Sequence, residues 1–309
     1  MRKGIHYMNK PIPDFLQSKL ITQYGEEMTN TIVDGYTKQR PVTLRVNTIK
    51  TTIEEVKKNL SEAGISYEEV VWSKEALLIP EVREDIIRAL PMYEKGEIYL
   101  QSLSSMLPPI LLAPEEGKSI LDMAAAPGGK TTQLVALTNN NAQITACEMN
   151  AIRAEKLKYN VEKQGATSVY VMVTDARRLD EYFSFDTILL DAPCSGSGTL
   201  MLANVDFEKG FTEKLIVKCV KAQTQLLQKA LSVLKPGGEM VYSTCSILQE
   251  ENENIVQQAL QHTNAKIVPI DTSKLEGVPL LPVTLEGTVC ICPNEVYEGF
   301  YIAKIRKLA

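Results

Sequence analysis

Two cysteines and an aspartate stand where the chain leaves apolar runs. Cys194 follows the run 187–190 together with Asp191, and Cys245 follows a second run at 239–243. Short, continuous apolar runs are typical of strands that are buried on both faces of a sheet. Because ligands of doubly wound sheets bind outside the carboxyl ends of the strands, we expect the thiols and the acid to meet in one cleft. The alternative is that both cysteines pack as small buried hydrophobes.

Paired thiols beside an acid are suited to chemistry on a pyrimidine ring. A thiolate can add to carbon 6 of the ring, which turns carbon 5 into a nucleophile that can take a methyl group. A base must then remove the carbon-5 proton so that the thiolate can be expelled. Only the thiolate attacks, so such a site must lower a thiol pKa from about 8.5. Asp191 would hydrogen-bond the pairing edge of the base. The chemistry alone leaves open which cysteine attacks and which assists.

The segment 124–130 joins an expected strand to an expected helix. Small residues and glycines let the backbone approach a ligand closely, and a helix N-terminus adds oriented amide groups. The spacing matches neither the dinucleotide motif G-x-G-x-x-G nor the P-loop, so a nucleoside triphosphate is not indicated. The candidate cofactor contacts in this segment are Ala124, Ala125, Ala126, Pro127, Gly128, Gly129 and Lys130.

Three acids each follow an expected strand. Glu148 comes 20 residues after Gly128, where such folds place a carboxylate on ribose hydroxyls, and Asp175 and Asp191 follow later strands. Together with the small-residue segment, they favour a nucleoside-bearing ligand without a pyrophosphate. S-adenosylmethionine fits this description better than NAD does. Helix capping explains any one of the acids, but explains all three less well.

From residue 119 onwards, expected strands alternate with expected helices, which is the pattern of an α/β fold with a parallel sheet. Helices are predicted between the strands, including 151–164 and 211–234. The predicted strands are 119–123, 143–147, 169–173, 186–190, 239–243, 266–270, 288–291 and 299–305.

The first part of the chain predicts a small α+β module, and we divide the chain into residues 1–95 and 96–309. Lys38, Arg40 and Arg45 cluster at one strand entrance, where either a phosphate contact with RNA or a solvated face explains them. The elements expected here are a helix at 11–36, a strand at 42–47, a helix at 51–63, and strands at 66–71 and 76–79.

Composition narrows the class of protein without naming it. The 309 residues carry a net charge of −5, so any nucleic-acid contact must use a local basic patch. The absence of a long apolar run argues against a transmembrane helix, and the start lacks a signal-peptide pattern, so we expect a cytoplasmic protein without a membrane partner. The six scattered cysteines do not form a disulfide framework, and Cys290 and Cys292 lack the second pair that a zinc site needs. We expect a monomer without a metal.

The chain resembles the Sun-type RNA (cytosine-5) methyltransferase family over nearly its whole length. The N-terminal layout is similar to the bacterial ribosomal-RNA branch of that family. The motifs that carry the resemblance are Asp122 to Thr131, Asp191 to Gly196, Ser243 to Ser246, Leu44 to Thr48, Gln101 to Leu107 and Glu298 to Lys304.

The resemblance implies a Rossmann-like class I methyltransferase with a seven-stranded, mostly parallel sheet behind the N-terminal module. It implies that Cys245 is the nucleophile, that Cys194 assists product release, and that Asp191 contacts the cytosine beside the cofactor. The segment 124–130 would hold the methionine part of S-adenosyl-L-methionine. The remaining implied contacts are Glu148 to ribose, Asp175 to adenine and Arg153 as a further cofactor contact. The candidate RNA contacts of the N-terminal module are Lys38, Arg40, Arg45 and Asn47.

Three departures from the family pattern bear on RNA binding. A basic pair common after Gly198 is replaced by residues 200–203, a Pro-His pair becomes Pro293-Asn294, and the connector reads Gln101-Ser102. The expected function is S-adenosylmethionine-dependent methylation of carbon 5 of a cytosine in RNA, with ribosomal RNA favoured over transfer RNA. The alternative is an RNA-binding assembly factor that keeps the methyltransferase fold without turnover.

Overall fold

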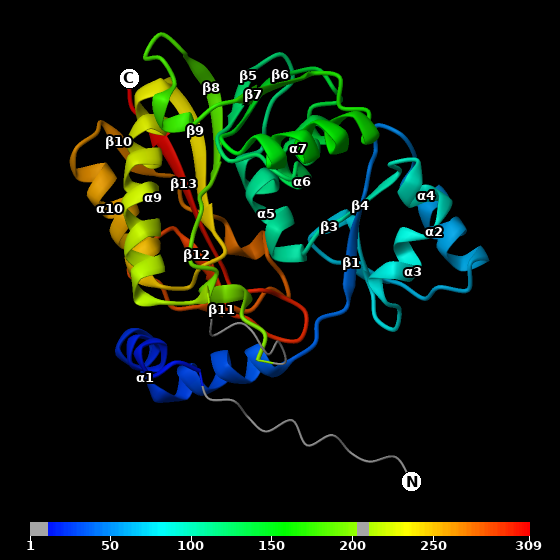
Figure 1. The fold of residues 1–309 in the computed structure, drawn as a ribbon, viewed down its shortest axis with the longest axis horizontal. Helices are drawn as coiled ribbons and strands as arrows, with labels where there is room; N and C mark the ends of the chain where they lie inside the picture. Colours follow the sequence, from blue (N-terminus) through cyan, green and yellow to red (C-terminus); the bar gives the residue numbers. More distant parts are fainter. Residues whose placement is uncertain (1–11, 203–209) are drawn as a thin grey trace.

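The computed structural model describes residues 12–202 and 210–309. Two sheets divide the molecule, a small one near the N-terminus and a large one that carries the rest of the chain (Figure 1). In these described ranges, no helix is both long enough and apolar enough to cross a membrane.

The small sheet has the strand order β2-β3-β1-β4, and each neighbouring pair is antiparallel. Its strands are β1 (Val42–Val46), β2 (Glu68–Val70), β3 (Ser73–Ile79) and β4 (Ile98–Leu100), and its helices are α2 (Ile53–Glu62), α3 (Glu84–Arg88) and α4 (Pro91–Glu94). The expected capping residue is in place, since Thr52 Oγ1 accepts a hydrogen bond from the Glu55 amide at 3.2 Å. Val56 and Leu60 of α2 are fully buried against Leu44 and Leu77 of the sheet. This packing forms an independent apolar core.

The large sheet has the order β11-β12-β13-β9-β8-β5-β6-β7, with β10 paired to β13. Pairings from β9 to β7 are parallel, and those made by β10 to β13 are antiparallel. The strands are β5 (Ser119–Asp122), β6 (Gln143–Glu148), β7 (Val169–Val173), β8 (Phe185–Asp191), β9 (Leu234–Thr244), β10 (Ala265–Ile267), β11 (Leu280–Leu281), β12 (Val289–Ile291) and β13 (Phe300–Lys307).

The α/β prediction is confirmed, but the strand count and direction need correction. Among the described residues the sheet has nine strands instead of seven, and half of its pairings are antiparallel. The strands beyond the parallel part come from the chain after residue 264 and need no crossover helix between them. β11 is only two residues long, which is too short to leave a periodic pattern in the sequence.

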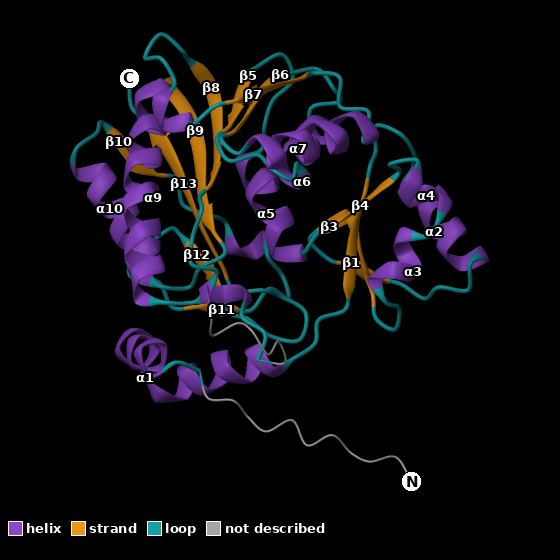
Figure 2. Ribbon diagram, viewed as in Figure 1, coloured by secondary structure: helices purple, strands orange, loops and turns teal. Residues whose placement is uncertain are grey.

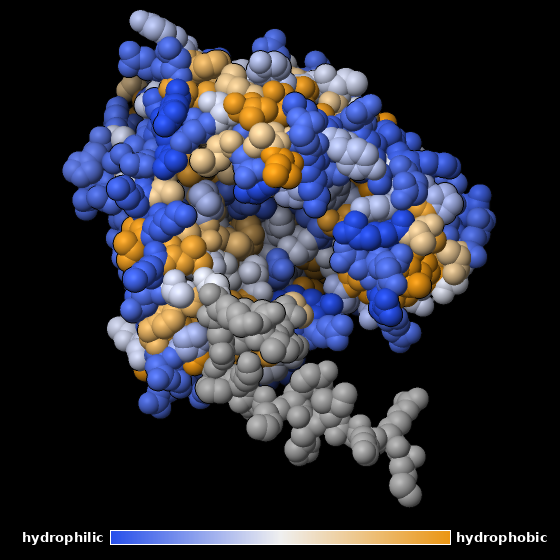
Figure 3. Space-filling model, in the orientation of Figure 1, coloured by the Kyte–Doolittle hydropathy of each residue, from blue (hydrophilic) through white to orange (hydrophobic). Residues whose placement is uncertain are grey.

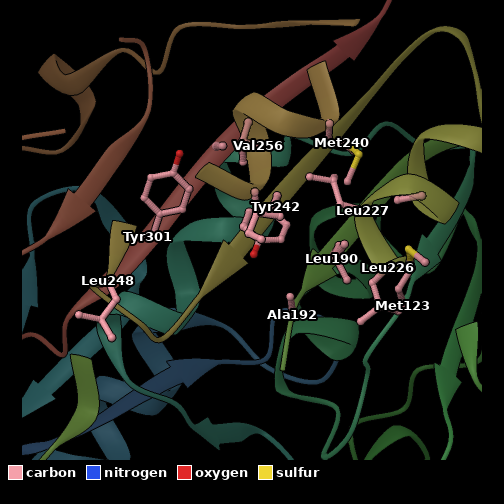
Figure 4. Close-up of a cluster of buried hydrophobic side chains, with 14 of the residues drawn as sticks. Met123, Leu190, Ala192, Leu226, Leu227, Met240, Tyr242, Leu248, Val256 and Tyr301 are labelled. Carbon is pink, nitrogen blue, oxygen red and sulfur yellow. The ribbon is translucent and has the colours of Figure 1, made fainter. Parts of the chain in front are cut away.

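Helices cover both faces of the large sheet (Figure 2). One face packs α9 (Glu213–Val233) and α10 (Glu253–Gln261), and the other packs α5 (Leu103–Leu112), α6 (Gly129–Leu137) and α7 (Ala151–Lys163). Successive residues of one strand serve the two faces, because Leu190 packs with α9 whereas Leu189 packs with α5. Figure 4 shows the α9 layer, where Leu190 and Tyr242 lie beside Leu227. Each such buried side chain stabilises the fold by about 1.5–3 kcal/mol.

The division at residues 95 and 96 does not match the strand pairing. β4 pairs with β1 and so extends the small sheet to Leu100. Helix α1 (Asp14–Thr37) packs Leu16, Leu20 and Ile32 into the core of the large sheet, although it precedes the small one. The predicted helix at 11–36 is present but kinked, since Gly25 has φ +79°; residue 11 lies outside the described chain.

Candidate active site

The two thiols meet at the carboxyl edge of the parallel strands. Cys194 follows β8 and Cys245 directly follows β9, and these strands are neighbours in register, with Asp191 opposite Ser243. Their sulfur atoms lie 3.1 Å apart, and both residues are partly exposed. Contact with Cys245, burial and the charge of Glu251 together raise the pKa of the Cys194 thiol well above its usual range. The neighbouring strand ends therefore create a thiol pair in which Cys194 is strongly held in its protonated form.

Asp191 is held between the thiols and the cofactor segment. Its Oδ2 accepts a hydrogen bond from Lys130 Nζ at 2.7 Å, and its Oδ1 accepts one from Ser243 Oγ at 2.8 Å. Lys130 lies in the first turn of α6 and also donates to Ser105 Oγ at 2.7 Å. Its ammonium lies 5.3 Å from the ring centre of Phe300. These contacts fix a charged pair at the floor of the site, where each ion satisfies the other.

The segment between β5 and α6 forms the wall of a cavity. Arg153 Nη2 donates to the carbonyl of Ala126 at 2.9 Å, and Asn160 Nδ2 donates to that of Pro127 at 2.8 Å, so α7 supports the segment from outside. Gly128 has φ +108°, a conformation that glycine adopts without strain. Figure 3 shows the face hollowed between the two sheets. The cavity measures about 260 Å³, and residues of both sheets line it: Tyr99, Leu100, Gln101, Ser102, Ser105, Asp122, Ala124, Ala125, Ala126, Pro127, Gly129, Lys130 and Asp191.

Asp122 is a further polar residue of this cavity to which the sequence analysis gave no role. It ends β5 and is buried, and its Oδ2 accepts a hydrogen bond from Thr131 Oγ1 at 2.7 Å. Burial and the nearby charge of Asp191 raise its pKa to about 6, against the lowering effects of Thr131 and Lys130. The signal for it was its position at the end of a predicted strand, which Glu148 and Asp191 share.

Glu148 and Asp175 lie in different surroundings. The Glu148 carboxylate is buried, accepts the Asn150 amide at 2.8 Å and lies 3.6 Å from Arg153 Nη2. The Asp175 carboxylate accepts hydrogen bonds from Arg177, from Nη2 at 2.7 Å and from Nε at 2.9 Å. These hydrogen bonds lower the pKa of Asp175. Asp175 lines a separate open hollow of about 610 Å³ next to α9, while the Ala124–Lys130 wall belongs to the smaller cavity. The two acids follow neighbouring parallel strands, as the sequence predicts.

The candidate RNA contacts divide into accessible and buried residues. Lys38 is partly exposed and pairs with Asp34 at 3.0 Å, and Arg40 donates through Nε to the carbonyl of Tyr297 at 2.9 Å. Arg45 is 3% exposed and Asn47 is 1% exposed, so neither side chain is available to an RNA strand. The prediction that these two side chains contact RNA was therefore wrong. The alternative, that Arg45 lies on a solvated face, was wrong as well.

Arg45 and Asn47 instead join the small sheet to the large domain. Arg45 donates to Gln101 Oε1 at 3.1 Å and to Thr132 Oγ1 of α6 at 3.0 Å. Asn47 donates to the carbonyls of Gly96 and Gln164, each at 2.8 Å. Burial lowers the pKa of Arg45 to about 10, which leaves it charged at neutral pH. An alternating strand with a polar residue on its inner face gives no sign of which neighbour it will meet.

The three departures from the family pattern lie in different parts of the structure. Gln101 is buried and bridges Arg45 to Gln133 Oε1 at 3.0 Å. Asn294 Oδ1 accepts the amides of Val296 and Tyr297, so it closes a turn. In the segment after Gly198, Leu200 is buried and residue 203 lies outside the described chain.

The two cysteines near the C-terminus do not form part of a metal site in the described chain. Cys290 and Cys292 are both buried in the core, and Cys290 contacts the Tyr24 hydroxyl at 3.8 Å. The described ranges contain no cluster of three or more His, Cys, Asp or Glu side chains that could hold a metal ion.

Fold and site together define a Rossmann-like methyltransferase domain with a paired-thiol edge and an N-terminal ferredoxin-like domain. The family model for 16S rRNA methyltransferase RsmB/F matches residues 109–306, and the model for the RsmF/B-like ferredoxin-like domain matches residues 12–83. The chain belongs to the RsmB/F methyltransferase family.

Several known proteins are similar to the chain over most of its length. A mouse (Mus musculus) 28S rRNA (cytosine-C(5))-methyltransferase is 36% identical over 96% of this chain and 39% of its own length. The ribosomal RNA small subunit methyltransferase F of Shewanella oneidensis is 36% identical over 85% of this chain and 56% of its own. The chain therefore corresponds to only part of these curated relatives.

Solved structures agree with the fold. A methyltransferase homologue from Pyrococcus horikoshii is 33% identical and has a TM-score of 0.80, over 96% of this chain and all of that one. The NSun6 structure from the same organism, solved with SFG, has a TM-score of 0.85 at 23% identity, over 96% of this chain and 98% of that one, which supports the fold alone.

Proposed function

We propose that this chain transfers a methyl group from S-adenosyl-L-methionine to carbon 5 of a cytosine in ribosomal RNA. The observation that carries the proposal is the pair of thiols 3.1 Å apart at the edge where Asp191 and Lys130 also lie. One cysteine is enough for nucleophilic addition, so a second thiol in contact with the first points to a reaction that also needs assisted release.

The cavity and the strand ends beside it supply groups that suit the cofactor. Its wall of Ala124, Ala125 and Ala126 leaves room for a ligand against the backbone, and Gly129 lets the segment lie against Tyr99, whose ring carbon would be 3.0 Å from an added Cβ. Glu148 offers a buried carboxylate for ribose hydroxyls at the end of the next strand. The cofactor supplies the electrophilic methyl group. The chain's own part is to hold the methionine end at residues 124–130, the ribose at Glu148 and the adenine near Asp175, with Arg153 supporting the segment.

The two thiols have different roles in the proposed reaction, attack for Cys245 and release for Cys194. The raised pKa of Cys194 keeps that thiol protonated, so the attack is assigned to Cys245, whose sulfur lies 3.1 Å away and reacts after its own proton has passed to solvent. Attack forms a bond from Cys245 Sγ to carbon 6 of the cytosine, and carbon 5 takes the methyl group. Asp191 and Lys130 stabilise the charge that develops on the ring.

Release follows from the change of charge on Cys245. Once Cys245 is bonded to carbon, its contribution to the raised pKa of Cys194, which is the largest one, is gone, so Cys194 loses its proton to solvent more readily. The Cys194 thiolate then takes the proton from carbon 5, the bond between Cys245 Sγ and carbon 6 breaks, and Cys245 leaves as a thiolate. The balance is one methyl group gained by the base and one proton lost.

Ribosomal RNA is the proposed substrate because the family model and both curated relatives carry it in their names. The names refer to RNA of different ribosomal subunits, so the test uses ribosomal RNA from both subunits. The target cytosine must be unpaired or flipped out of a helix, since the thiol cannot reach carbon 6 within a stack. Lys38 and Arg40 remain as the candidate phosphate contacts of the N-terminal part.

The test uses naked ribosomal RNA from both subunits with methyl-labelled cofactor. Wild-type protein should label one RNA, and Cys245→Ala should reduce the label at least 10³-fold. Equal labelling by the two proteins would contradict the assignment of the nucleophile. Calorimetry with the cofactor separates the alternative, because an assembly factor without turnover would show no binding at millimolar cofactor.

A further inference from the structure

Glu251 is a buried carboxylate that the proposed reaction does not use. It ends the short helix η3 (Gln249–Glu251) between β9 and α10, and its side chain is inaccessible to solvent. In the described chain, no Lys, Arg or His lies within ion-pair distance of it. A buried carboxylate without a neighbouring cation depends on hydrogen bonds to satisfy it.

Its hydrogen bonds run to both cysteine loops. Oε1 accepts the Ser195 amide at 2.8 Å and Gln223 Nε2 at 3.3 Å. Oε2 accepts Ser195 Oγ at 2.5 Å and Ser246 Oγ at 2.6 Å. Ser195 is the residue next to Cys194, and Ser246 is the residue next to Cys245. A single carboxylate therefore links the residues that follow the two reacting thiols.

The same loops are also joined directly. The Gly198 amide donates to the Cys245 carbonyl at 3.0 Å, and the hydroxyls of Ser197 and Ser246 lie 2.8 Å apart. Gln223 of α9 ties the Pro193 carbonyl to the network at 3.0 Å. Loops with this many fixed contacts hold their side chains in one geometry, as a site for bond formation requires.

The charge of Glu251 acts on the Cys194 thiol. The groups that face Cys194 are Cys245, Glu251 and the buried hydroxyl of Tyr242, which donates to the Glu251 carbonyl at 2.6 Å. The carboxylate contributes to the raised pKa of Cys194. A negative charge beside Cys194 opposes its ionisation, and the proton that the two thiols share stays there.

We propose that Glu251 is a positioning residue for the thiol pair: its carboxylate holds the two cysteine loops together, and its charge keeps the shared proton on Cys194. This inference rests on the proposed function for its meaning in catalysis. The thiol geometry and the protonation of Cys194 are measurable without methyl transfer, so the two proposals can fail separately.

The test is the pH dependence of Cys194 alkylation by iodoacetamide, mapped by mass spectrometry in a Cys245→Ala background. Glu251→Gln keeps the shape and most of the hydrogen bonds but removes the charge. It should lower the midpoint of Cys194 alkylation by about one pH unit. The matched control is Glu253→Gln, which changes a buried glutamate two residues away whose contacts run to the Thr284 backbone and to its own amide. An unchanged midpoint in Glu251→Gln, or an equal shift in Glu253→Gln, would overturn the proposal.

A second measurement tests the geometry with both cysteines present. Diamide should close a Cys194–Cys245 disulfide quickly in the wild type and at least five-fold more slowly in Ser246→Ala, which removes one bond to Glu251. In methyl transfer, Glu251→Gln should lower kcat about ten-fold and leave the KM values for cofactor and RNA within two-fold. If Glu251→Gln does not fold, Ser246→Ala decides alone, and wild-type disulfide rates in that variant would overturn the proposal.

Discussion

The two halves of the site are built in opposite ways. The cofactor half is a cavity walled by small residues, and the polar side chains of Asp122 and Lys130 line it while hydrogen-bonded to neighbours of their own. In the thiol half, Glu251, Ser195 and Ser246 satisfy one another in a buried network. A pocket that must bind and release a ligand needs open space, whereas a site that makes a covalent bond needs groups that do not move. This difference explains why the cofactor half keeps an open cavity and the thiol half is filled by a network of hydrogen bonds.

The halves meet at Asp191, which receives Lys130 from the cofactor side and Ser243 from the strand that carries Cys245. Changes at this junction should affect both halves, and changes deeper in either half should affect only one. The following variants test that division, in order of decreasing effect.

Lys130→Met should have the largest effect, because it removes the cation from Asp191 and from the site where charge develops on the ring. Methyl transfer should fall by about 10²–10³-fold. Steady-state kinetics should show raised KM for the cofactor together with lowered kcat. Lys118→Met, an exposed lysine paired only with Glu115 at 3.9 Å, is the control and should retain wild-type rates. A raised KM for the cofactor with an unchanged kcat in Lys130→Met would contradict the idea that this residue serves both halves.

Asp122→Asn should change how stability depends on pH. Burial raises the pKa of Asp122 in the folded protein to about 6 from 3.8, so ionising it costs the wild type stability as pH rises from about 4 to about 6. The variant avoids this loss, and above pH 6 its relative free energy of unfolding should have gained about 2 kcal/mol compared with pH 4. Urea titrations at pH 4, 5, 6 and 7 measure the difference. A stability difference that stays constant over this range would contradict the account of the cofactor half.

Gly198→Ala should loosen the thiol half. An added Cβ would lie 2.1 Å from the Gly299 carbonyl oxygen, so the backbone must shift where Gly198 contacts Cys245. We expect a loss of about 2–3 kcal/mol in unfolding free energy and a wider thiol pair, with slower disulfide closure by diamide. In Gly210→Ala, where no atom of the described residues lies within 4 Å of the new Cβ, both should remain close to wild type. Unchanged disulfide closure in Gly198→Ala would show that this contact does not set the thiol distance.

Arg45→Lys should have the smallest effect, because it acts on the cofactor half only from behind. Lysine keeps the charge but cannot reach Gln101 and Thr132 together, so we expect a loss of about 1–2 kcal/mol and a several-fold rise in the KM for the cofactor. Thermal unfolding and cofactor titration measure the two effects. Arg88→Lys, at an exposed pair with Glu84 in the same N-terminal part, is the comparison. Equal losses of stability and equal KM values in the two variants would contradict the proposal that Arg45 supports the cofactor half through Gln101 and Thr132.

The sequence carried more information about the catalytic edge than about the joint between the domains. Cys194, Cys245 and Asp191 could be placed together because parallel strands deliver the residues after their carboxyl ends to one edge, whatever the details of packing. The partners of Asp191 could not be foreseen, since Lys130 reaches it through a side-chain conformation that tertiary contacts decide.

Arg45 and Asn47 show the limit most clearly. Their position in an alternating strand next to basic residues made them candidates for RNA, and only the packing of the small sheet against α6 and the end of α7 buries them. Glu251 also escaped notice, because its importance comes from two loops that meet around it and are separated by 50 residues of sequence. The antiparallel strands after β9 were undercounted because very short strands leave no periodic pattern.

The most direct test of the central claim is covalent trapping on RNA. Cys194→Ala, incubated with ribosomal RNA and S-adenosyl-L-methionine, should accumulate a protein–RNA adduct that survives denaturing electrophoresis, because addition by Cys245 is intact and release is not. Cys245→Ala should form none. An adduct trapped by Cys245→Ala, with none in Cys194→Ala, would contradict the account by reversing the roles of the two thiols.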